Sequence, residues 1–100
     1  MLHVLAFITA KPGKRAEVLE AFHRIVPTVH AEAGCIEYGP VVDAEGIGMA
    51  AFGPDTFVVV EKWESAETLG AHGRAAHMAA YAEEVKDLIA HRAVHVLRAA

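Results

Sequence analysis

The sequence predicts an α+β fold with the element order strand, helix, strand, strand, helix, strand. Its 100 residues are enough for one hydrophobic core, so a single domain is expected to span residues 1–100. Four segments are apolar and β-branched, as strands are, and two segments carry the three- to four-residue apolar spacing of helices. This order is the ferredoxin-like βαββαβ pattern, in which an antiparallel four-stranded sheet carries its helices on one face.

The first strand and the first helix are predicted in residues 2–33. Residues 2–10 are apolar and β-branched, and they end at Lys11-Pro12-Gly13, a turn that cannot continue a strand. The helical spacing runs from Lys14 to about Ala33 and predicts a helix that ends near Gly34. Pro27 removes a helical hydrogen bond inside this pattern, so we expect a kink there.

Two strands and a long connection are predicted next. Residues 35–42 form the second strand, in which Gly39-Pro40 indicates a bulge or an edge position. Residues 56–63 give the clearest strand pattern of the chain. Residues 43–55 between them are rich in glycine and form a loop. Long loops are often functional lids, although a mobile hairpin connection is an equally good interpretation.

The last third of the chain predicts an interrupted helix and a final strand. Ser65 can cap a helix, and the region between Gly70 and Gly73 interrupts it. We therefore expect a short helix, a longer helix from about Ala75 to Ile89, and a strand over residues 92–98. The buried stripe of the longer helix is expected to be Met78, Tyr81, Val85 and Leu88.

Both faces of the predicted sheet are apolar, because alternate strand residues face opposite sides. One face of the third strand carries Phe57, Val59, Glu61 and Trp63, and the other carries Thr56, Val58, Val60 and Lys62. In the first strand, Leu5 and Phe7 lie opposite Val4 and Ala6. The helices cover only one face, so the sequence predicts a homodimer packed sheet to sheet, the alternative being a few harmlessly exposed valines.

The composition limits the classes of partner. Nine lysines and arginines against 13 aspartates and glutamates give a net charge of −4. This argues against nucleic acid or an anionic membrane surface as a partner, because both select basic patches. No apolar run reaches the ~18 residues of a membrane span. Cys35 is the only cysteine, so no internal disulfide can form, and we expect a cytoplasmic protein.

Three residues are candidates for catalysis. Glu61 lies on an apolar strand face, where burial would raise its pKa toward that of a general acid or base; the alternative is a strand-end ion pair with arginine or lysine. His72 and His77 can act as a base and an orienting donor, or simply be surface or capping histidines. Their spacing does not match the zinc helix pair and no ligand cluster accompanies them, so no metal site is predicted.

Four further residues are candidates for binding the substrate. Tyr38 and Trp63 can stack on an aromatic ligand, although aromatic strand residues more often belong to the core. Phe22 and His30 lie on the first helix. His30 faces either the space between helix and sheet or the solvent, and the pattern does not separate the two.

Several motifs together resemble the antibiotic biosynthesis monooxygenase family, in its quinol monooxygenase-like branch. They are Lys11-Pro12-Gly13-Lys14, the segment 32–38, and the Glu-x-Trp-x-Ser run at 61–65 followed by His72 and His77. The resemblance implies a dimeric α+β barrel with a cavity between the sheet and the helices of each subunit. It also implies oxidation of an aromatic or polycyclic quinol by O2 with no metal, flavin or haem, and we expect the 43–55 loop to set substrate choice.

Three functions follow as hypotheses. The first is a cofactor-free monooxygenase in which His72, assisted by Glu61 or His77, deprotonates a phenolic hydroxyl. The second is an isomerase that enolises a small carbonyl compound or a phosphorylated signal molecule with Glu61 and His72, since a fold does not fix a reaction. The third is a ligand-binding dimer with no turnover.

Overall fold

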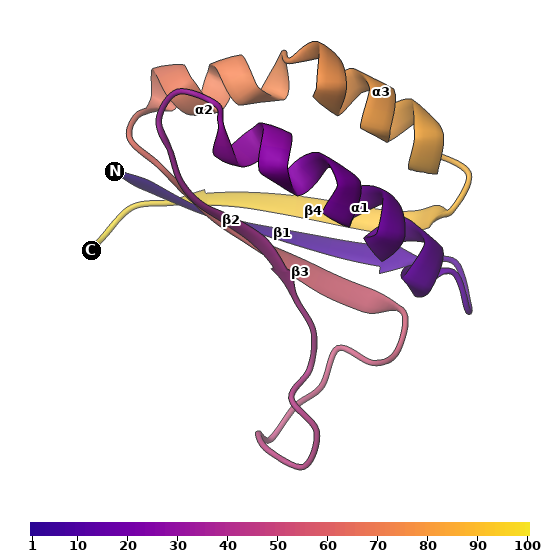
Figure 1. The fold of residues 1–100 in the computed structure, drawn as a ribbon. Coiled ribbons are helices and arrows are strands. Elements are labelled where there is room, and N and C mark those ends of the chain that lie inside the picture. Colours follow the sequence, from indigo (N-terminus) through magenta and orange to yellow (C-terminus); the bar gives the residue numbers. More distant parts are fainter.

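A computed structural model describes residues 1–100 and shows a four-stranded antiparallel sheet with three helices on one face (Figure 1). The sheet order is β2-β3-β1-β4, which is the ferredoxin-like order and confirms the predicted fold class. The elements are β1 (Leu2–Ala10), α1 (Arg15–His30), β2 (Cys35–Val41), β3 (Thr56–Trp63), α2 (Ala66–Gly73), α3 (Ala76–Val85) and β4 (Ile89–Leu97).

Two helix ends differ from the expectation. α1 ends at His30, before the predicted Ala33, because the chain turns there to enter β2, and Gly34 takes a positive φ of 80° in that turn. α3 ends at Val85, and β4 begins at Ile89, three residues earlier than predicted. The reason is a contact outside the helix: the Leu88 carbonyl accepts the Lys11 N–H at 2.8 Å, which joins this turn to the end of β1.

The structure also shows where the two predicted irregularities, in β2 and in α1, lie. β2 is an edge strand, as Gly39-Pro40 indicated, but its register shift lies between Cys35 and Glu37. Pro27 lies in the last turn of α1, where only a short part of the helix follows it. The Ser65 cap is confirmed, since its hydroxyl accepts the Thr68 N–H at 3.2 Å in a capping box.

The core lies between the sheet and α1. Its fully buried side chains are Trp63, Phe22, Phe57, Val4, Val18 and Val29. The Phe22 ring stacks on Tyr38 at a centroid distance of 5.3 Å and meets Phe57 and Tyr81 edge to face. α1 thus fills the space above β2 and β3, whereas α2 and α3 arch over the remaining part of the same face (Figure 1).

The second face of the sheet carries no helix. Thr56 and Val58 are buried there, and Leu5, Phe7 and Val60 are half-buried, so the predicted division of the strand residues between two apolar faces is confirmed. The connection between β2 and β3 extends away on this side (Figure 1), and the ring of Phe52 packs on Phe7 at 5.5 Å. No helix combines the length and the apolar character that crossing a membrane requires.

Candidate functional site

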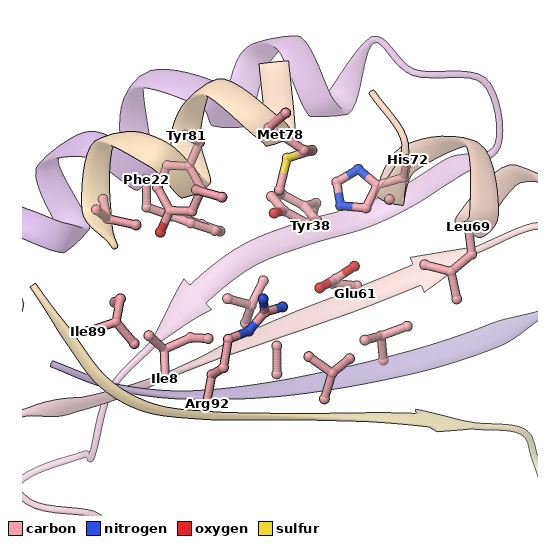
Figure 2. Close-up of a pocket in the computed structure, with 18 of the residues that line it drawn as sticks. Ile8, Phe22, Tyr38, Glu61, Leu69, His72, Met78, Tyr81, Ile89 and Arg92 are labelled. Carbon is pink, nitrogen blue, oxygen red and sulfur yellow. The ribbon is translucent and has the colours of Figure 1, made fainter. Parts of the chain in front are cut away.

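A cavity of about 720 Å³ lies between the sheet and the arch formed by α2 and α3. Fifteen of its 20 lining residues are hydrophobic, so water inside it has few hydrogen-bond partners. Figure 2 shows the polar side chains that project into it, among them Tyr38 from β2, Glu61 from β3 and His72 from α2. Val94 and Val96 of β4 line its exposed side, with 48% and 53% of their surface accessible. An apolar cavity with a few convergent polar groups is typical of a small-molecule site.

Glu61 is held in the cavity wall by its strand. It pairs with Val4 of β1 and Tyr38 of β2, so its side chain lies on the helix side, and only 6% of the residue is exposed. The Trp63 Nε1–H donates to Oε1 at 2.9 Å, and no arginine or lysine forms an ion pair with it. Burial raises the pKa of Glu61, partly offset by that hydrogen bond. Glu61 therefore keeps its proton to a higher pH than an ordinary glutamate.

His72 lies in the last turn of α2 and is 7% exposed. Its ring packs on Trp63 at a centroid distance of 4.7 Å and meets Tyr38 edge to face at 5.3 Å. Its Nδ1 lies 2.9 Å from Oε2 of Glu32. The Nε2 of His72 has no hydrogen-bond partner within the chain. Because every buried side-chain polar atom does have a partner, Nε2 is not buried, and it is accessible from the cavity that His72 lines.

Glu32 is a site residue for which the sequence predicted no role. It lies between α1 and β2, and the same Oε2 is also 2.8 Å from Nε2 of His77. A carboxylate can only accept, so His72 donates its Nδ1–H and His77 its Nε2–H. The Nε2 of neutral His72 then carries a lone pair toward the cavity. No local signal revealed Glu32, since 40 residues separate it from His72; its segment was noted only within the family resemblance.

The same three residues have the composition of a metal site. One ligand atom each of Glu32, His72 and His77 lies within 4.8 Å of the others. The sequence did not predict this cluster because Glu32 is 40 residues from His72, outside any local ligand motif. The two short contacts to one carboxylate oxygen are, however, accounted for by two N–H donors. We interpret the cluster as a hydrogen-bonded triad that orients His72.

Three of the predicted site residues lie outside the cavity. Trp63 has no exposed surface, so it supports Glu61 and His72 from behind and cannot stack on a ligand. His77 does not line the cavity and is linked to it only through Glu32 and then His72. His30 lies in a separate surface groove beside β2, where its Nε2 is 2.7 Å from the Tyr38 carbonyl oxygen. Phe22, Tyr38, Glu61 and His72 do line the cavity.

The 43–55 loop also lies away from the cavity. None of its residues is among the lining residues, and its Phe52 packs on the opposite face of the sheet. The expectation that it sets substrate choice is therefore not met within one chain. Asp43 closes the loop by accepting the N–H groups of Phe52 and Gly53 at 3.0 and 2.9 Å, and these two donors lower the pKa of Asp43.

Comparison with known proteins agrees with the resemblance noted in the sequence. The family model for antibiotic biosynthesis monooxygenase matches residues 1–84. The probable quinol monooxygenase YgiN of Escherichia coli strain K12 is 43% identical over 101 residues, covering 98% of this chain and 97% of that protein.

Solved structures agree with the fold. PA3566 from Pseudomonas aeruginosa superposes with a TM-score of 0.83 at 25% identity, covering 99% of this chain and 94% of that one. An antibiotic biosynthesis monooxygenase crystal structure gives 0.83 at 24% identity, covering 100% and 99%. The match to the family model spans most of the chain and the relative at 43% identity spans nearly all of it. This protein is therefore an enzyme of the antibiotic biosynthesis monooxygenase family.

Proposed function

We propose that this protein is a cofactor-independent monooxygenase that oxidises an aromatic quinol with O2. The observation that carries the proposal is His72, whose Nδ1 is 2.9 Å from Glu32 and whose Nε2 is open to an apolar cavity. The cavity of about 720 Å³ is in the size range of ligand pockets. The name of the relative YgiN, a probable quinol monooxygenase, supports the class of substrate.

The first chemical step is removal of the phenolic proton by His72 Nε2. Histidine exchanges protons near neutral pH, which suits this task. The positive charge that develops on the ring lies against the Glu32 carboxylate, which holds the imidazole in one tautomer. Tyr38 lines the cavity as a neutral donor, because burial and then the charge of Glu61 raise its pKa. Tyr38 is placed to donate a hydrogen bond to a substrate oxygen, and the buried carboxyl of Glu61 lines the same cavity.

The oxidation needs no cofactor, because the electron-rich anion itself reduces O2. One electron passes to O2, and the radical pair combines at a ring carbon that still carries hydrogen. The resulting peroxide takes a proton from the His72 imidazolium. Loss of the carbon-bound proton and cleavage of the O–O bond then give a new carbonyl at that carbon and water, so that a quinol becomes a hydroxyquinone. One oxygen atom enters the product and the other leaves as water, so the low polarity of the cavity and the fixed geometry are the contributions of the protein.

Simple quinols in air-saturated buffer test the proposal, with quinone absorbance and oxygen uptake followed together. We expect a rate above the autoxidation blank, a fall of about 100-fold or more in His72→Ala, and one atom of label from ¹⁸O2 in the hydroxyquinone product. His23→Ala is the matched control, because His23 is exposed on α1 and does not line the cavity. A rate no higher than the blank, or unchanged in His72→Ala, would contradict the assignment.

The same assay separates the other two hypotheses. Turnover of a carbonyl compound under nitrogen would indicate enolisation, since that reaction consumes no oxygen. Saturable binding with no turnover of either kind would indicate a ligand-binding protein. An open cavity in which Glu61 has no ion-pair partner favours catalysis over the last of these.

We further propose that the partner is a second copy of this chain, packed on the second face of the sheet. Leu5, Phe7 and Val60, which the chain itself leaves half-buried, form its apolar centre. The adjoining loop exposes Ile47 to 80% and Phe52 to 58%. A contiguous apolar face of this kind is rare on a soluble monomer, and the sheet-to-sheet contact would cover it.

A further inference from the structure

Arg92 is the one guanidinium in the wall of the cavity. It pairs with Ile8 in the register of β4 against β1, so its side chain projects from the helix side of the sheet. Figure 2 shows it rising over Ile8 toward the interior of the cavity. Arg92 comes from an edge strand and is itself solvent-exposed, so a ligand can reach its guanidinium without any rearrangement of the core.

No carboxylate neutralises Arg92. No acidic side chain lies within 4.0 Å of it, whereas the other cation of the wall, Lys86, is 2.7 Å from Glu83. The only acidic residue lining the cavity is Glu61, whose carboxyl accepts the Trp63 N–H and forms no ion pair with Arg92. Burial is the main cause that raises the pKa of Tyr81, which is about 12, and the charge of Arg92 opposes that rise, so this charge does reach the cavity.

Arg92 and Glu61 project from different positions along the sheet, and Figure 2 shows His72 on the Glu61 side of the cavity. Glu61 pairs with Val4 of β1, and Arg92 pairs with Ile8 of the same strand. Four residues of a strand span about 13 Å, which separates the two rows along the sheet. The long Arg92 side chain shortens this gap, so the ligand that would bridge it is an aromatic ring system and not a single small group. The wall between the two ends is formed by apolar side chains such as Ala6, Ile8 and Val59.

From this arrangement we propose that Arg92 binds an anionic substituent of the substrate, a carboxylate or a similar oxyanion, at the end of the ring system away from the hydroxyl that His72 deprotonates. The inference rests on the proposed function for the orientation of the ring, but the anion site itself does not require oxidation. A guanidinium matches a carboxylate with two parallel hydrogen bonds. It would fix which ring hydroxyl meets His72, and so select one regiochemistry.

The test is binding of two ligands that differ only in charge, 6-hydroxy-2-naphthoate and its methyl ester, measured by isothermal titration calorimetry. Neither is a quinol, so no turnover is needed. We expect the acid to bind about tenfold or more tightly than the ester. Added salt should reduce this advantage, because an accessible ion pair is screened. Arg92→Gln should remove the advantage and leave the ester unchanged, whereas Arg92→Lys should keep part of it.

Arg98→Gln is the matched control, since Arg98 follows the end of β4 and does not line the cavity. Equal affinity of wild type for acid and ester, equal loss of both ligands in Arg92→Gln, or no saturable binding of either ligand would overturn the inference. Selectivity for the acid without any quinol oxidation would overturn the proposed function alone. Quinol oxidation without selectivity for the acid would overturn this inference alone.

Discussion

At the scale of single residues, the buried carboxyl of Glu61 makes stability depend on pH in a direction unusual for a glutamate. Its pKa in the folded protein is raised above the unfolded value of 4.5. Between these two values the folded state holds more protons than the unfolded state, so the free energy of unfolding falls as pH rises from about 4.5 to the raised pKa. Glu61→Gln has no such ionisation and should not show this loss.

Urea denaturation at a series of pH values measures this effect. Below the unfolded pKa, wild type and Glu61→Gln should differ by a constant amount, and above it the variant should become progressively more stable relative to wild type. Glu45→Gln is the control, because Glu45 is exposed in the loop and should change nothing with pH. A stability difference for Glu61→Gln that is independent of pH would show that burial does not penalise the charged form.

Glu32 gives a second prediction at this scale, as a positioning residue for His72. Glu32→Ala leaves His72 Nδ1 without its acceptor, so the neutral ring is no longer held with its lone pair on Nε2. We expect kcat to fall about 10- to 100-fold with KM little changed. Glu32→Gln should recover part of the activity, since its amide oxygen can still accept an N–H.

Nitrogen-15 NMR of the histidine rings checks this prediction independently of turnover. Wild type should show His72 protonated at Nδ1, and Glu32→Ala should show a mixture of tautomers. A fall in kcat with an unchanged tautomer would mean that Glu32 acts only through folding. The same kind of variant tests whether the triad binds a metal. Zn²⁺ binding that both Glu32→Ala and His77→Ala abolish would show that the triad is a metal site and not a hydrogen-bonded group that orients His72.

At the scale of elements, the entry to β2 and the start of α2 depend on each other. Gly34 has a φ of +80°, and a Cβ added there would lie 2.5 Å from the Thr68 side chain, which belongs to the capping box of α2. Gly13 has a similar φ of +77° but nothing within 4 Å. Gly13→Ala should therefore cost only the left-handed backbone penalty, about 1–2 kcal/mol. Gly34→Ala should cost about 1–3 kcal/mol more, because Thr68 must move.

Chemical denaturation of the two alanine variants compares these costs directly. Equal losses would show that the capping box of α2 accommodates the extra methyl group.

A local sequence pattern predicts contacts between residues that are close in the chain and misses contacts between distant ones. The Ser65 cap was predictable because its partner is three residues away. The end of α3 was not, since the Lys11 N–H that meets the Leu88 carbonyl comes from the other end of the chain.

At the scale of the whole molecule, the apolar second face of the sheet predicts assembly. Light scattering should give about twice the chain mass of 10.7 kDa at micromolar concentration. Phe7→Glu places a charge at the centre of this face and should shift the protein to monomer. Ala80→Glu adds the same charge on an exposed position of α3 and should leave the mass unchanged. A monomeric wild type, or a Phe7→Glu variant that stays dimeric, would contradict the sheet-to-sheet arrangement.

The sequence by itself determined the order of the elements, the two apolar faces of the sheet and the position of Glu61 among hydrophobic neighbours. These depend on periods of two and of three to four residues, which are local and readable. Only the tertiary structure decided that Glu32 orients His72, that Trp63 lies behind the cavity and that Arg92 lies in its wall. Those relations join residues that are distant in sequence, or depend on what another element covers. No local pattern contains them, because they arise only when the chain closes on itself.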